Sequence, residues 1–129
     1  MVLVDTSVWI EFFRRQRPFD LEAMVDIDDV VTCLPVLQEV LQGFRDEPAY
    51  RAARDAMIHM PIIEDPLGLS VVEEAVGLYR TARRNGITVK SSVDCLVAAC
   101  ALRHDCEVLH RDRDYAALAR VSRLRQRSL

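Results

Sequence analysis

The sequence predicts an α/β fold built around a central, mainly parallel sheet. Short apolar segments of strand type alternate along the chain with longer segments whose apolar residues recur at helical spacing. The chain has 129 residues, of which 50% are hydrophobic, and this is enough for one core but too little for two. We therefore expect a single domain over residues 1–129.

The first half of the chain begins with a short apolar strand at 2–4, which ends at Asp5, and continues with a helix at 6–14. We then expect a loop at 15–19, a short helix at 21–25, a strand at 30–32, helices at 35–43 and 48–59, and a brief extended segment at 61–63. Pro35 suits a first helical position, and Gly43 suits a helix end.

The second half repeats the alternation with longer helices. We expect a helix at 69–84 that ends at Asn85-Gly86, a helix from Ser91 or Ser92 to about His104, a strand at 107–109, a short helix at 115–119 capped by Asp112, and an edge strand near 121–124. In parallel sheets, ligands bind beyond the carboxyl ends of the strands, so these ends are the first place to look for a site.

Acidic residues stand at or near these strand ends and at the helix starts that follow them. They are Asp5, Glu39, Asp94, Asp112 and Asp114. Each has an ordinary alternative explanation, because Asp5 and Asp112 suit helix caps, a negative charge favours the first turn that holds Asp94, and Glu39 suits a solvated helix face. Gathered at one edge, however, several carboxylates would repel one another, and a bound hard cation such as Mg²⁺ or Mn²⁺ relieves that repulsion.

Four segments in order resemble the VapC-type toxins of the PIN-domain family. MVLVDTSVWIEFF resembles the family's opening, a strand followed by D-T-S-x-W, and PVLQEVLQG resembles the second motif, whose Glu lies in a helix. SSVDCLVAACALRHDCEVLHRDRDYAAL resembles the third and fourth motifs together. The agreement extends from Met1 to about Leu118 and implies a PIN-like three-layer α/β/α fold.

Carried over position by position, the resemblance implies that Asp5, Glu39, Asp94 and Asp112 are catalytic acids and metal ligands, with Asp114 as a more peripheral ligand. Thr6 or Ser7 would help to arrange the first carboxylate or a metal-bound water. This chain departs from many relatives at His110, where they carry Thr or Ser two residues before the fourth acid. We expect a supporting or purely structural role for His110.

The resemblance further implies an Mg²⁺- or Mn²⁺-dependent endoribonuclease, the toxin of a type II toxin–antitoxin pair. Such an enzyme hydrolyses phosphodiester bonds, often in tRNA or rRNA, and leaves a 5′-phosphate and a 3′-hydroxyl. The resemblance also implies a cognate VapB-type antitoxin and a homodimer. The net charge of −3 is low for a nucleic-acid partner, but metal-binding carboxylates contribute to it. Candidate RNA-backbone contacts, with an ordinary solvated basic surface as the alternative, are Arg14, Arg15, Arg84 and Lys90.

Two other functions remain open from the residues. A phosphatase with Asp5 as nucleophile is one, although such families usually show D-x-D where this chain has Asp5-Thr6-Ser7. A non-catalytic RNA- or partner-binding PIN-like module is the other. The chain has no apolar run of membrane-spanning length and no secretory signal pattern, so we expect a cytoplasmic protein without membrane contact. The four scattered cysteines then indicate reduced, mostly buried thiols.

Overall fold

The computed structural model describes residues 1–14 and 20–129. Its strands pair into one sheet in the order β3-β2-β1-β4-β5, and every pairing is parallel. The strands are β1 (Val2–Val4), β2 (Val30–Cys33), β3 (Ile62–Ile63), β4 (Glu107–His110) and β5 (Arg125–Ser128). The predicted parallel sheet is therefore confirmed.

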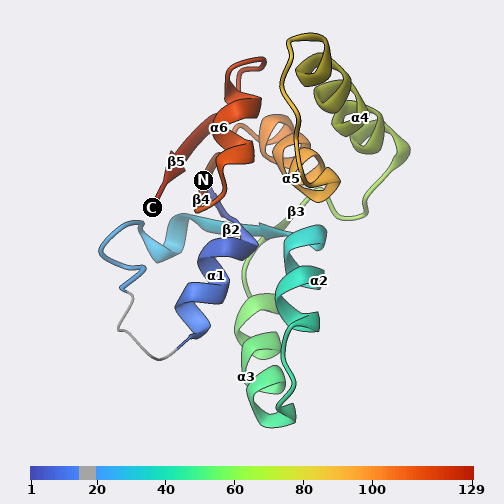
Figure 1. Cartoon of the computed structure of the whole chain (residues 1–129). Helices are drawn as coiled ribbons and strands as arrows, with labels where there is room; N and C mark the ends of the chain where they lie inside the picture. Colours follow the sequence, from blue (N-terminus) through green and yellow to red (C-terminus); the bar gives the residue numbers. More distant parts are fainter. Residues whose placement is uncertain (15–19) are drawn as a thin grey trace.

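Helices cover both faces of this sheet and form the outer two of three layers. They are α1 (Thr6–Phe13), α2 (Leu34–Gln42), α3 (Glu47–Ile58), α4 (Leu69–Arg84), α5 (Ser92–Arg103) and α6 (Arg113–Ala119). Figure 1 shows α1, α2 and α3 on one side of the sheet and α4, α5 and α6 on the other, with α3 extending away from the sheet beside α2. The strand order explains this division. The chain moves outward from β1 to β3 and then outward again from β4 to β5 in the opposite direction, and right-handed crossovers in opposite directions place their helices on opposite faces.

The point where the strand order reverses lies between the neighbouring strands β1 and β4. Helix α1 follows β1 and helix α6 follows β4, so the chain leaves these two strands toward opposite faces of the sheet. The Asp5 amide donates to the Leu109 carbonyl at 2.9 Å, which continues the pairing to the very end of β1. Open α/β sheets bind their ligands at such a switch point, and here Asp5 and Asp112 begin the two helices that leave it.

Helix α5 is apolar on nearly all sides because it is enclosed in the core. Its residues Val97 to Ala101 are fully buried, and its most extensive packing is against α4. Small side chains at Ala98 and Ala101 permit this close approach of backbones. The buried helix thereby carries Asp94, in its first turn, to the carboxyl end of the sheet.

Two predicted elements are wrong. The segment 21–25 is a single turn, with the Val25 amide donating to the Leu21 carbonyl at 3.1 Å, because five residues are too few to propagate a helix. A short 3-10 helix follows it at Ile27–Asp29. The last strand is not at 121–124, where Ser122 Oγ instead donates to the Leu118 carbonyl at 2.7 Å and forms a turn. The last strand begins at Arg125, and its polar sequence RQRS suits an edge strand.

The remaining predicted elements lie within a few residues of their expected places. Helix α4 ends where Gly86 adopts φ +74°, a left-handed conformation that glycine tolerates, and the Ile87 amide then donates to the Ala82 carbonyl at 2.9 Å. The expected loop at 15–19, with Arg15, lies outside the described residues. Across residues 1–14 and 20–129, no helix combines the length and apolar character that crossing a membrane requires.

Candidate metal centre

Three of the predicted acids meet at the carboxyl end of the sheet. Asp94, Asp112 and Asp114 each offer a carboxylate oxygen, and these oxygens lie within 4.8 Å of one another. Asp94 comes from α5, while Asp112 and Asp114 come from the start of α6. Two helices that are separated in the chain by β4 therefore place three carboxyl groups within the reach of one cation.

Asp5, the first acid, is buried beside this group and is held by hydrogen bonds on both of its oxygens. Its Oδ2 accepts from the Ser7 hydroxyl at 2.6 Å and from the Ser7 amide at 3.1 Å, which caps α1. Its Oδ1 accepts from the Tyr115 hydroxyl at 2.6 Å. The Ser7 hydroxyl in turn accepts from the Arg111 amide at 3.0 Å, so Ser7 joins the ends of β1 and β4. Asp5 is therefore the predicted helix cap, and its carboxylate also binds Tyr115.

Asp94 is the most perturbed acid of the group. It is 6% exposed, and its Oδ2 has no hydrogen-bond partner among the residues that the structure describes. Burial, followed by the neighbouring carboxyls of Asp112 and Asp5, raises the pKa of Asp94 to about 9. A buried carboxyl oxygen without a partner is costly, and a cation in contact with it would remove that cost.

Asp112 and Asp114 also take part in the local backbone structure. Asp112 caps α6, with its Oδ1 accepting from the Asp114 amide at 3.0 Å. Asp114 is buried, and its Oδ2 accepts from the amides of Lys90 and Ser91 at 3.0 and 3.2 Å. Ser91 precedes α5 without a side-chain capping bond of its own, so Asp114 fixes the start of the helix that carries Asp94.

Glu39 lies outside the group of three. Its Oε1 accepts from the Thr6 hydroxyl at 3.0 Å, which connects α2 to the start of α1. Thr6 and Ser7, the two candidate supporting residues, therefore bind different acids. Ser7 donates to Asp5 and Thr6 donates to Glu39. A catalytic or metal role for Glu39 stays a prediction, as do the roles assigned to the four aspartates.

His110, the departure noted in the sequence, is buried at the end of β4 beside the site. Its Nδ1 accepts from the Asp112 amide at 3.1 Å, and its Nε2 lies 2.6 Å from Gln126 Oε1 on β5. An acceptor at Nδ1 and an acceptor oxygen opposite Nε2 require the neutral tautomer with its proton on Nε2. His110 thus orients the backbone that presents Asp112 and does not point an atom at the acids.

Tyr115 was not among the site residues that the sequence predicted. This side chain is fully buried, and its hydroxyl contacts Asp5 Oδ1 at 2.6 Å and Asp94 Oδ1 at 3.3 Å. Its ring packs against His110 with 5.0 Å between centroids. Burial and the two carboxylates raise the pKa of Tyr115 well above its usual value, so the hydroxyl keeps its proton. The only indication in the sequence was its place directly after Asp112 and Asp114.

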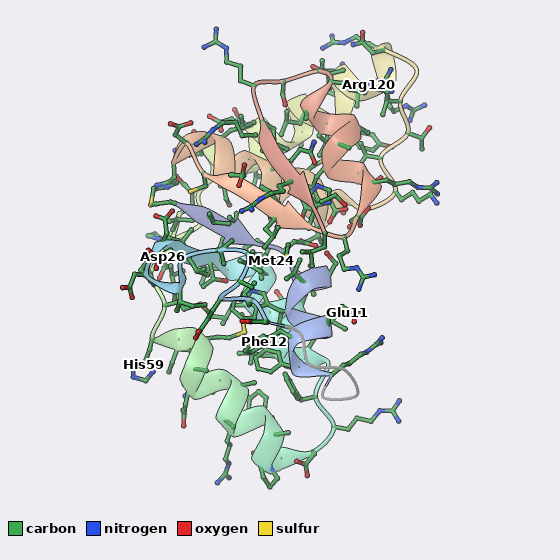
Figure 2. All side chains as sticks on the ribbon, turned by 90° about the vertical axis from the view of Figure 1, so that its left-hand side faces the viewer. Glu11, Phe12, Met24, Asp26, His59 and Arg120 are labelled. Atoms are coloured by element: carbon green, nitrogen blue, oxygen red, sulfur yellow. The ribbon has the colours of Figure 1, made fainter. Side chains whose placement is uncertain are left out.

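The candidate RNA contacts are dispersed. Lys90 is exposed, and its backbone adjoins Asp114, whereas Arg84 is exposed at the end of α4 and bonds Thr81. Arg14 is exposed and 3.8 Å from Glu11 on α1, the residue labelled in Figure 2. Glu11 also pairs with Arg111 at 3.3 Å, beside the end of β4. Lys90 is therefore the candidate that is tied most directly to the acids.

The donor set fits a hard divalent cation. The side chains that converge offer oxygen atoms alone, and they are partly or fully buried. Asp94 supplies an oxygen that has no hydrogen-bond partner within residues 1–14 and 20–129. Among the described residues, the metal-ligand groups of three or more that meet in space are confined to this cluster. The four cysteines are free and buried, as expected for reduced thiols.

Comparison with known proteins agrees with this fold. Residues 2–121 match the model of the PIN domain family. The chain is 33% identical to "VapC ribonuclease Mb1587" of Mycobacterium bovis and to "Ribonuclease VapC11" of Mycobacterium tuberculosis, in each case over 99% of this chain and 98% of the relative. The chain therefore belongs to the PIN-domain family. Its fold also matches a crystal structure of DNA-bound VapBC from Salmonella typhimurium with a TM-score of 0.78, at 13% identity over 98% of this chain and 96% of that one.

Proposed function

We propose that this protein is a divalent-metal-dependent endoribonuclease that acts as the toxin of a VapBC-type pair. The observation that carries the proposal is the buried carboxylate cluster at the switch point of the sheet, with one oxygen of Asp94 left without a partner among the described residues. Relatives named VapC ribonuclease that align over the full chain support the nuclease assignment.

In this proposal, Asp94, Asp112 and Asp5 hold an Mg²⁺ or Mn²⁺ ion, with Asp114 at the periphery and Glu39 assisting directly or through water. When bound, the ion lowers the pKa of water and stabilises charge on the phosphate. Ser7 and the Tyr115 hydroxyl keep Asp5 in place, and Asp114 fixes the start of α5. Hydrolysis of this kind needs no ribose 2′-hydroxyl, so selectivity for RNA depends on binding contacts, for which Lys90 and Arg14 are candidates.

The proposed substrate is a structured RNA of the tRNA or rRNA class, cut in the cytoplasm. The proposed regulator is a VapB-type antitoxin, because the matching solved structures include VapBC toxin–antitoxin complexes. We also propose that the active form is a homodimer.

Cleavage of total bacterial RNA by the purified, antitoxin-free protein tests the proposal. We expect discrete fragments with 5′-phosphates in Mg²⁺ or Mn²⁺, and their loss in EDTA and in Asp5→Asn and Asp94→Asn. Asp55→Asn, on the exposed face of α3, is the matched control and should cleave normally. Absence of both metal binding and cleavage would favour the binding module, and a covalent phosphoryl group on Asp5 would favour the phosphatase.

A further inference from the structure

Tyr115 is placed to act on two acids at once. It lies in the first turn of α6, three residues after Asp112, and its side chain is fully buried. Its hydroxyl reaches Asp5, which follows β1, and Asp94, which begins α5. A single phenolic oxygen thus joins three separate segments of the chain at the candidate metal centre.

The two contacts of this hydroxyl differ in length. A hydroxyl carries one proton, and the 2.6 Å separation from Asp5 Oδ1 marks the stronger bond, against 3.3 Å to Asp94 Oδ1. The hydroxyl therefore donates mainly to Asp5, and its contact with Asp94 Oδ1 is the weaker of the two. The carboxyl torsion of aspartate is broad and roughly two-fold, so a neighbouring contact decides which oxygen points where.

The contact between Tyr115 and Asp94 Oδ1 determines which oxygen of Asp94 stays free. With Asp94 Oδ1 turned toward Tyr115, Oδ2 is the atom without a partner among the described residues. Ser7 holds the opposite oxygen of Asp5 and fixes that carboxylate from its other side. The phenol and the serine together give the two carboxylates one orientation each before any cation arrives.

We propose that Tyr115 is a positioning residue of the metal centre, whose hydroxyl bridge between Asp5 and Asp94 presents a free Asp94 oxygen to a divalent cation. The inference rests on the proposed metal-dependent function. Phenylalanine would fill the same space but would remove the contact with Asp94 Oδ1 and would leave Asp5 held by Ser7 alone. Hydrogen-bond partners that orient metal ligands commonly contribute about 10–100-fold to metal affinity or activity.

Mn²⁺ binding to Tyr115→Phe, measured by calorimetry on the antitoxin-free protein, tests this role. We expect affinity for Mn²⁺ to fall by about tenfold or more. Tyr79→Phe, the same one-atom deletion on α4, is the control and should bind Mn²⁺ like the parent protein. Thermal unfolding in EDTA, recorded alongside, reports any purely structural effect, which by itself would lower the melting temperature and leave Mn²⁺ affinity unchanged.

A second measurement keeps Tyr115 intact. In a Tyr50→Phe/Tyr79→Phe background, Tyr115 is the one remaining tyrosine of three, and a carbon-13 label at its Cζ gives a single NMR signal. Addition of Mg²⁺ should move this signal with the midpoint that calorimetry gives for Mg²⁺ binding. A signal that stays fixed at saturating Mg²⁺, or equal Mn²⁺ affinity in Tyr115→Phe and the parent, would overturn the inference. Absence of Mn²⁺ binding in the parent would instead overturn the proposed metal-dependent function.

Discussion

In the absence of metal, the stability of the Asp94→Asn variant relative to that of the parent protein should increase as the pH rises. Burial and the neighbouring carboxyls raise the pKa of Asp94 from 3.8 to about 9, so between these values the folded state holds a proton that the unfolded state releases. Stability of the parent must therefore fall as pH rises through this interval. The amide side chain of asparagine does not ionise, so the Asp94→Asn variant escapes that loss.

The size of the effect follows from the same interval. One pKa unit corresponds to about 1.36 kcal/mol, so a full shift of this kind makes the parent up to about 2.7 kcal/mol less stable at pH 8 than at pH 6. Relaxation of the site and partial hydration reduce this figure, and an effect of about 1–2 kcal/mol is a realistic expectation. For a chain of this length, each kcal/mol moves the melting temperature by roughly 3–5 °C.

The assay is thermal unfolding of the parent and of Asp94→Asn in EDTA at pH 6 and pH 8, with Asp55→Asn as the exposed control. The melting temperature of Asp94→Asn relative to the parent should be several degrees higher at pH 8 than at pH 6, whereas Asp55→Asn should follow the parent. Added Mn²⁺ should stabilise the parent and have no effect on Asp94→Asn. An unchanged difference between Asp94→Asn and the parent at the two pH values would refute the claim that Asp94 is buried against its charged neighbours.

Three further predictions concern the same molecule. As the pH increases toward 8, Mn²⁺ affinity should rise by up to about tenfold per pH unit, because the ion must displace the proton of Asp94. Calorimetry in buffers of different ionisation enthalpy should show that about one proton is released per ion bound. A pH-independent affinity would contradict this. Ser7→Ala removes the hydroxyl that donates to Asp5 Oδ2 and should cost about 1–3 kcal/mol in urea unfolding while slowing RNA cleavage. Normal cleavage would contradict the assigned role. Arg103→Ala breaks two partly exposed ion pairs, with Glu64 at 2.7 Å and with Glu74 at 2.9 Å, and should cost about 2 kcal/mol or less without altering Mn²⁺ affinity. A loss of Mn²⁺ binding would show a coupling that the structure does not explain.

The sheet was predictable because its information is local. Val2–Val4 is a short apolar segment and Glu107–His110 has the apolar pair Val108-Leu109 at its centre, and the long helices between the strands require parallel crossovers. The acids at the strand ends then had to share one edge of the sheet. The last strand was misplaced because apolar character pointed to Val121 and Leu124, whereas an edge strand can be polar and is fixed by pairing with β4.

The inner arrangement of the site was less accessible to sequence. Whether Thr6 or Ser7 supports Asp5 depends on side-chain directions at the start of α1, and the structure assigns Ser7 to Asp5 and Thr6 to Glu39. The hydroxyl of Tyr115 contacts Asp5 and Asp94, which lie 110 and 21 residues away from it in the sequence, and no rule of residue spacing predicts these contacts. Asp114 resembled a peripheral ligand, yet its contacts with the backbone before α5 also give it a clear structural task.

The proposed function requires that the clustered carboxylates form a divalent-cation site that serves RNA cleavage. Anomalous diffraction from crystals of the antitoxin-free protein containing Mn²⁺ tests it most directly, because the peak locates the ion without assuming its ligands. We predict a peak at coordination distance from Asp94 and Asp112, with Asp5 directly bound or joined through water, and its absence in Asp94→Asn. Mn²⁺-dependent RNA cleavage by a protein whose bound Mn²⁺ lies elsewhere would contradict the account.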